Sequence, residues 1–150
     1  MSVSEIVWHI RAAQVLATAL GISNILQPGL VKELILAQTL GHTPITSKAN
    51  ADARDADGRL YEYLCSLSSS NNFQMDRVTQ NNRDRITRNE AFYFAFFTDP
   101  VTLAEVFRVE TSVVLNEAER QLVRSRNDIS HLNLTGAWVR RNGTRVPLES

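Results

Sequence analysis

The chain has 150 residues, of which 43% are hydrophobic and 21% charged, and its formal net charge is zero, as in one globular domain. Its single cysteine, Cys65, excludes an internal disulfide framework, and no apolar run approaches the ~18 residues that a membrane span needs. Because the start also lacks a basic leader, these features predict a cytosolic protein.

Two helices are expected at the start of the chain. Apolar residues recur at helical spacing over residues 5–20, with Ser4 as the N-cap and Gly21 just after the end. A second apolar stripe covers residues 30–40 and stops at Gly41. These helices carry more apolar surface than one helix pair needs, so part of it is expected to face a second subunit.

The middle of the chain predicts a loop followed by strands. Residues 42–58 are polar and small, as in a loop, and residues 59–65 then read as a strand. The aromatic run at residues 91–97 is typical of a central strand that is covered on both faces. A turn at residues 99–100 leads to a strand at residues 103–109, which completes a hairpin.

A helix and a second hairpin are expected at the end. Residues 116–126 have helical spacing, with Glu117 early and Arg124 late, an order that complements the helix dipole. Residues 137–148 surround Asn142-Gly143, a strong signal for a closing hairpin. The whole order predicts a single mixed α/β domain over residues 1–150.

An acidic loop runs into the first predicted strand. Asp52, Asp55 and Asp57 precede this strand, and Glu62 lies in its middle. Carboxylates from a loop and an adjacent strand can converge on one Mg²⁺, which prefers oxygen ligands. Asp55 and Asp57 alternatively form a simple polar turn. Glu62 interrupts an apolar strand, where a charge needs a partner or a metal.

An Asp followed about ten residues later by Glu-x-Lys on a strand is the pattern of the PD-(D/E)xK nucleases. The sequence resembles the PvuII family of type II restriction endonucleases over nearly its whole length. The resemblance is carried by residues 21–27, Asp52-Ala53, Asp55, Gly58, Tyr61-Glu62, Phe73 and Phe94-Ala95. It implies a mixed central sheet flanked by helices, with N-terminal helices used for dimerisation.

The resemblance also implies a metal site. Asp52 and Glu62 would be the ligating carboxylates and the backbone carbonyl of Tyr63 a further ligand, with Mg²⁺ as the cofactor and Mn²⁺ as a substitute. Leu64 stands where the family has its catalytic lysine. Because a leucine offers no proton, charge or hydrogen bond, this departure is expected to impair cleavage.

Three explanations of Leu64 remain open. It is a deliberate inactivating substitution, or it belongs to a natural variant in which another basic residue takes over, or the chain is a DNA binder that has lost cleavage. The basic residues considered for the second explanation are Lys48, Arg54 and Arg59.

In the family, the segment after the catalytic strand reads bases in the major groove. Here this segment is residues 73–82, which lack the family's histidine run and alternatively form a solvated polar loop. The candidates for base contacts are Arg77 for guanine, Asp76 for cytosine, and Gln74, Gln80, Asn81 and Asn82 for adenine. The candidates for phosphate contacts are Lys32, Arg83, Arg85 and Arg88, and Gln27 would lie near the minor groove.

Fourteen of the sixteen basic residues are arginine, and four of these lie between residues 77 and 88. Codon preference in a GC-rich genome explains the excess but not the clustering. The histidines, His9, His42 and His131, lack metal-ligand spacing and are interpreted as structural.

The sequence therefore predicts a homodimeric restriction endonuclease acting on a short palindromic site in double-stranded DNA, with no membrane contact and a cognate methyltransferase in the host. Within one domain, residues 1–41 would dimerise, residues 42–110 would cleave and read DNA, and residues 111–150 would complete the fold. The rival interpretation is a sequence-specific DNA-binding protein without catalysis. A weaker third is an α/β domain unrelated to DNA, with Glu62 paired to an arginine.

Overall fold

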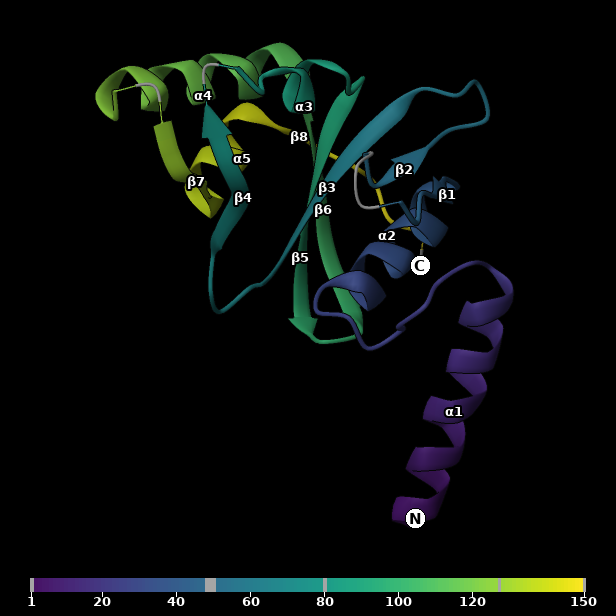
Figure 1. The fold of residues 1–150 in the computed structure, drawn as a ribbon. Coiled ribbons are helices and arrows are strands. Elements are labelled where there is room, and N and C mark those ends of the chain that lie inside the picture. Colours follow the sequence, from purple (N-terminus) through teal and green to yellow (C-terminus); the bar gives the residue numbers. More distant parts are fainter. Residues whose placement is uncertain (1, 48–50, 80, 127, 150) are drawn as a thin grey trace.

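The computed structural model describes residues 2–47, 51–79, 81–126 and 128–149 (Figure 1). A mixed six-stranded sheet runs through its centre in the order β1-β2-β3-β5-β6-β8. Its strands are β1 (Thr43–Pro44), β2 (Ala53–Arg54), β3 (Leu60–Leu67), β5 (Ala91–Asp99), β6 (Thr102–Glu110) and β8 (Thr144–Arg145). Only β3 and β5 pair in parallel, and the other neighbours are antiparallel. The expected mixed sheet flanked by helices is confirmed.

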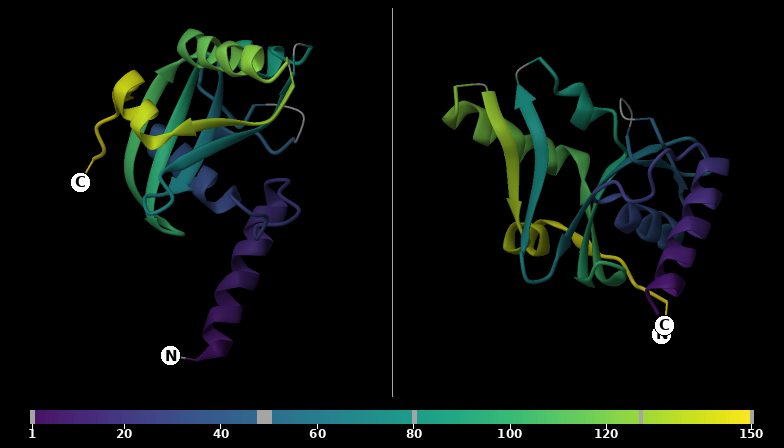
Figure 2. Two further views of the ribbon diagram at one scale, coloured as in Figure 1. Left: turned by 90° about the vertical axis from the view of Figure 1, so that its left-hand side faces the viewer. Right: turned by 60° about the horizontal axis from the view of Figure 1, so that its bottom comes forward.

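The remaining elements surround this sheet. A separate antiparallel pair is formed by β4 (Asn72–Thr79) and β7 (Asp128–Thr135), which lies beside α4 (Thr111–Arg124) on one side of the molecule (Figures 1 and 2). The short helices α3 (Asp84–Thr87) and α5 (Gly136–Asn142) adjoin this side. The other side carries α2 (Leu30–Leu40), while α1 (Val3–Ala19) projects from the body.

Strand β5 divides the core into two clusters. Phe92, Phe94 and Phe96 pack toward α4 and the β4–β7 pair, while the alternate residues Tyr93 and Phe97 pack toward α2. Because side chains alternate along a strand, both faces of β5 are covered, and every residue from 91 to 97 is buried. The predicted central aromatic strand and its hairpin to β6 are confirmed.

Both N-terminal helices are confirmed, with a different start for the first. The N-cap of α1 is Ser2 and not Ser4, because the Ser2 hydroxyl accepts a hydrogen bond from the N–H of Glu5 at 3.3 Å. Gly21 (φ 82°) follows α1 and Gly41 (φ 71°) ends α2, both with left-handed backbone. None of the helices in the described ranges is long and apolar enough to cross a membrane.

The C-terminal predictions need correction. The prediction of a closing hairpin is wrong, because the segment before Gly143 forms α5, whose Val139 is fully buried in the core. Thr135 caps this helix by accepting a hydrogen bond from the N–H of Trp138. Helix α4 starts five residues earlier than predicted, at Thr111, so Glu117 lies within the helix and not in its first turn.

Four strands were not predicted as such. The polar region before β3 contains the short strands β1 and β2, and residues 128–135 form β7. The interpretation of residues 73–82 as a loop is wrong for residues 73–79, which belong to β4. These strands became recognisable only through their pairing partners, because each is short or exposes polar residues on one face.

Candidate active site

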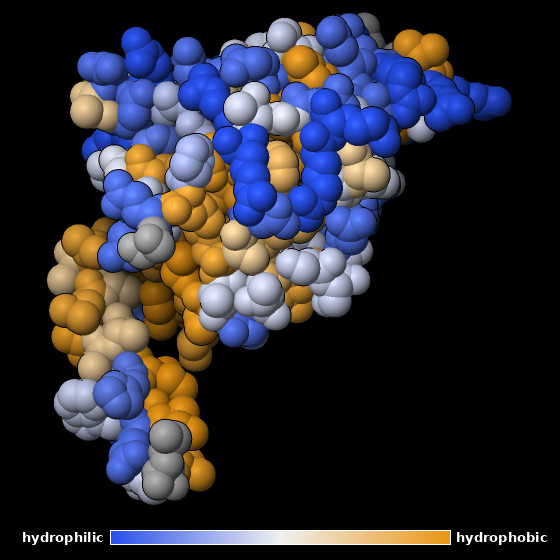
Figure 3. All heavy atoms as spheres, turned by 180° about the vertical axis from the view of Figure 1, so that it is seen from behind, coloured by the Kyte–Doolittle hydropathy of each residue, from blue (hydrophilic) through white to orange (hydrophobic). Residues whose placement is uncertain are grey.

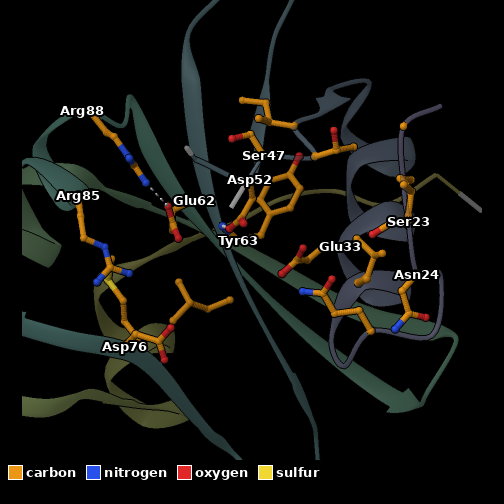
Figure 4. A pocket seen from close by; sticks show the side chains of 18 of the residues that line it. Ser23, Asn24, Glu33, Ser47, Asp52, Glu62, Tyr63, Asp76, Arg85 and Arg88 are labelled. Atoms are coloured by element: carbon orange, nitrogen blue, oxygen red, sulfur yellow. Dashed lines mark hydrogen bonds and ion pairs between the residues drawn. The ribbon is translucent and has the colours of Figure 1, made fainter. Parts of the chain in front are cut away.

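A hollow of about 680 Å³ opens where the loop after α1, the segment before β2, and parts of β3, β4 and α3 meet (Figure 4). Of the residues predicted for the site, those that line it are Gln27, Asp52, Glu62, Tyr63, Leu64, Gln74, Asp76, Arg85 and Arg88. Segments that are far apart in sequence thus bring the predicted carboxylates and part of the predicted DNA-reading strand to one cavity.

Asp52 is fixed by the pairing of its own segment with β3. Its N–H donates to the carbonyl of Tyr61 at 3.1 Å, and its Oδ2 accepts from the N–H of Tyr63 at 2.8 Å. These bonds extend the antiparallel ladder between β2 and β3 beyond the end of β2. Asp52 is therefore placed next to β3 by backbone geometry.

The other two acidic residues of the loop form a turn away from the hollow. Asp55 Oδ1 accepts from the N–H groups of Asp57 and Arg59 at 2.9 and 3.0 Å, while its Oδ2 accepts from the hydroxyl of Tyr61. Gly58 adopts the left-handed backbone that this turn requires (φ 82°). The alternative prediction of a polar turn at Asp55 and Asp57 is confirmed.

Glu62 points to the opposite face of β3 from Tyr61 and Tyr63, which pack toward α2. Its carboxylate is largely buried, and its Oε2 has no hydrogen-bond partner within the part of the chain that the structure describes. The nearest cation is the guanidinium of Arg88, whose Nη2 lies 4.0 Å from this oxygen.

Burial and mutual repulsion shift the pKa values of the acidic groups at the hollow. Burial raises the pKa of Asp52, and burial together with the charge of Asp52 raises the pKa of Glu62. The pKa of Glu33 on α2 is also raised, to about 8, mainly by burial and to a smaller extent by the charge of Asp52. Three carboxyl groups thus share a site with too little compensating positive charge.

This arrangement fits a divalent cation held by few protein ligands. Asp52 and Glu62 supply oxygen donors, and the unsatisfied Oε2 of Glu62 is a donor atom that a cation would engage. Among the described residues, no three His, Cys, Asp or Glu side chains form a metal-binding group. Water or backbone oxygens would therefore complete the coordination, as is common for Mg²⁺.

Position 64, which lines the hollow beside Glu62, is occupied by a leucine and therefore supplies no positive charge. Leu64 lies on the same face of β3 as Glu62, is 7% exposed and packs in the core cluster that contains Phe73 and Met75. The replacements considered from the sequence do not line the hollow. Arg54 is exposed on β2 and Arg59 pairs with the turn at Asp57, while Lys48 lies outside the described residues.

The predicted DNA-reading residues fall into two groups. Gln74 and Asp76 lie on the exposed face of β4 and line the hollow, and Gln74 donates to Asn133 Oδ1 on β7 at 3.0 Å. Gln27, Arg85 and Arg88 also line the hollow. The remaining candidates lie outside it: Arg77 pairs with Asp128, Asn82 binds the N–H of Thr79, Asn81 is exposed, Arg83 pairs with Glu119, and Lys32 lies over the ring of Phe97. Gln80 is outside the described residues.

Sequence reasoning missed Glu33 and assigned Arg88 only to phosphate contact. Glu33 is the sole carboxylate of the otherwise mostly apolar α2, and this isolated charge could have marked it as a candidate site residue. Its place at the hollow depends on how α2 docks, which helical periodicity does not specify. Arg88 follows α3, a four-residue helix with no periodic pattern to detect.

A family model described as "Restriction endonuclease PvuII" matches residues 1–146. The match covers the whole hollow, including both buried carboxylates and α3. No curated protein matches the chain.

Proposed function

Because the chain belongs to the PvuII restriction endonuclease family, we propose that it uses Mg²⁺ to hydrolyse phosphodiester bonds at a short palindromic site in double-stranded DNA. The observation that carries this proposal is the buried pair of Asp52 and Glu62 at the hollow beside β4. Two buried carboxylates that repel each other destabilise the fold, but they can hold a cation between them. The cavity beside them is large enough for a phosphate group.

Asp52, Glu62 and the backbone carbonyl of Tyr63 would hold the cation, with Mn²⁺ as a substitute. The bound cation would lower the pKa of a water molecule and polarise the phosphoryl oxygens. The oxygen of the water forms a bond to phosphorus while the bond to the 3′ oxygen breaks. The 3′ oxygen takes up a proton from solvent, the water loses one to solvent, and the phosphate remains on the 5′ side.

Leu64 makes this site slower than one with lysine. A leucine cannot orient the attacking water or stabilise charge on the phosphorane, and losing such a contact costs on the order of a hundredfold in rate. Because Leu64 packs in the core cluster that contains Met75, we expect the impairment to concern chemistry and not folding.

Pairing of two copies through α1 would place two sites on opposite DNA strands. Helix α1, which projects from the body, exposes apolar patches that alternate with polar side chains (Figure 3). Its exposed large apolar residues are Val3, Ile6, Trp8, Ile10, Val15 and Leu16. Such a surface is unusual on a monomer, and a two-fold dimer would match a palindromic site. A cognate methyltransferase in the host would protect that site.

In this proposal the chain is one domain over residues 1–150. Residues 1–41 dimerise, residues 42–110 carry the catalytic and DNA-reading elements, and residues 111–150 complete the fold. On the DNA, Gln74 and Asp76 are the leading candidates for base contacts because they adjoin the carboxylates. The other candidates for base contacts are Arg77, Gln80, Asn81 and Asn82. The candidates for phosphate contacts are Lys32, Arg83 and Arg85, and Gln27 would lie near the minor groove.

The direct test compares DNA cleavage by the chain as written with cleavage by the Leu64→Lys variant, in Mg²⁺ and in Mn²⁺. Discrete fragments that appear faster with the lysine variant support the nuclease. If neither protein cuts DNA while both bind it, the alternative function of a DNA-binding protein without catalysis takes its place. Failure of both to bind DNA would contradict both functions.

A further inference from the structure

Two arginines approach the carboxylate pair from α3. Arg85 lies in α3 and Arg88 follows it three residues later, so both project from one side of this helical turn. Both line the hollow, and Arg88 Nη2 lies 4.0 Å from Glu62 Oε2. Figure 4 shows Arg88 extending toward Glu62, Arg85 extending toward the strand that carries Asp76, and Asp52 on the other side of the Glu62 carboxylate.

The backbone that carries these arginines is fixed to the core. Ile86, between them, is fully buried. The Asn89 side chain donates to the carbonyls of Arg85 and Ile86 at 2.9 and 3.2 Å, and the Thr111 hydroxyl donates to the Asn89 carbonyl at 2.9 Å. The arginines are therefore held in position by α4 before any ligand binds, which is the condition for effective electrostatic stabilisation.

No other described cation lines the hollow. Arg83, the third arginine of this segment, pairs with Glu119 at 2.7 Å. Arg85 donates from Nη1 to the carbonyl of Arg77 at 3.1 Å, which ties it to the end of β4. Arg88 is thus the cation that the structure places closest to the buried carboxylates.

We propose that Arg88 provides the positive charge at the scissile phosphate that Leu64 cannot provide. This inference rests on the proposed nuclease function. A guanidinium remains protonated, so Arg88 does not accept a proton from the attacking water, which still loses it to solvent. Its planar donors can instead bind two oxygens of the phosphoryl group and stabilise the charge that develops on them.

The test combines substitutions at both positions. Cleavage rates in Mg²⁺ are compared for the chain as written, Arg88→Ala, Leu64→Lys and the double variant. In the chain as written, Arg88→Ala is expected to reduce the cleavage rate by roughly a hundredfold or more. In the Leu64→Lys background, it is expected to reduce the cleavage rate by less than tenfold. Arg88→Lys should restore part of the lost rate, and Arg120→Ala, at an ion pair with Glu117 on α4 away from the hollow, is the matched control with little effect.

A structural role for Arg88 would give a different pattern. Loss by the same factor in both backgrounds, or no loss in either, overturns the inference while leaving the nuclease function supported. If Leu64→Lys and the chain as written both fail to cut, the nuclease function itself fails and the inference falls with it.

A second measurement needs neither metal nor cleavage. Binding to duplex DNA in EDTA is measured over a range of salt concentrations. Arg88→Ala should reduce the slope of log Kd against log salt by about one, because one phosphate contact is lost. Arg120→Ala, folded to the same extent by circular dichroism, should leave the slope unchanged. An unchanged slope for Arg88→Ala would show that its guanidinium serves only Glu62, which overturns the inference.

Discussion

The main-chain N–H of Tyr63 donates a 2.8 Å hydrogen bond to the side chain of Asp52, eleven residues earlier in the chain. This bond holds a loop carboxylate against β3, next to Glu62. The carboxylates are thus brought together by folding itself, and folding must offset their burial and repulsion. Several consequences for stability and activity can be measured.

Glu62→Gln should stabilise the metal-free protein while abolishing cleavage. At pH 9 in EDTA, removing one of two buried charges is expected to raise the free energy of unfolding by about 1 to 3 kcal/mol. Urea unfolding measures this change. Glu110→Gln, at an exposed ion pair with Arg108, is the control and should have little effect. A lower stability of Glu62→Gln would mean that the pairing with Arg88 outweighs the repulsion.

Glu33 should make the stability of the metal-free protein depend on pH. Burial and the charge of Asp52 raise its pKa from 4.5 to about 8 in the folded state, so the folded protein holds a proton that the unfolded chain releases. This contribution to stability is present below pH 4.5 and is lost as the pH rises to about 8. In EDTA, the free energy of unfolding of Glu33→Gln should therefore vary less with pH over that range than that of the unchanged protein. An equal slope for both proteins would contradict this assignment.

Leu16→Glu should dissociate a dimer formed through α1. Leu16 is 70% exposed on the projecting helix, and a buried charge in an apolar interface strongly disfavours association. Sedimentation velocity should show the mass of two chains for the unchanged protein and one for the variant. Val123→Glu on α4, where Val123 is 78% exposed, is the matched control. If both variants sediment as the unchanged protein does, α1 is not the interface.

Asp76→Ala should relax sequence selection. Asp76 is exposed on β4 and adjoins the hollow, and a carboxylate in the major groove accepts a hydrogen bond from cytosine. Its loss should reduce discrimination at one base pair by roughly ten- to a hundredfold. Cleavage of a duplex library by the Leu64→Lys background measures this. Asp57→Ala, at the turn away from the hollow, is the control. Equal weakening on every sequence would place Asp76 outside base recognition.

The elements predicted well were those whose own residues specify them. The helix over residues 30–40 and the strand at residues 91–97 show clear periodicity or a continuous apolar run, and both were found. The segment around Asn142-Gly143 was mistaken because its turn signal is local, whereas burial of Val139 against the core decides the structure. Strand β7 depends on its pairing with β4, which no local pattern reveals.

The candidate site was predictable only in part for the same reason. Glu62 was indicated by its place in an apolar strand, whereas the choice of Asp52 among three acidic residues depended on the family resemblance. The structure brings both to one hollow. Glu33 reaches that hollow through the docking of α2, and Arg88 through the anchoring of Asn89 to Thr111. Such placements join segments far apart in sequence, so they emerge from the tertiary structure.

The proposed nuclease function requires that Asp52 and Glu62 form a cation-dependent cleavage site. The most direct measurement is digestion of plasmid DNA in Mg²⁺ and in EDTA by the Leu64→Lys protein, with and without Glu62→Gln. We expect discrete fragments with 5′-phosphate ends only in Mg²⁺, and a loss of at least roughly a hundredfold in rate when Glu62 is replaced. Cleavage that persists in EDTA, or that is unaffected by Glu62→Gln, would contradict it.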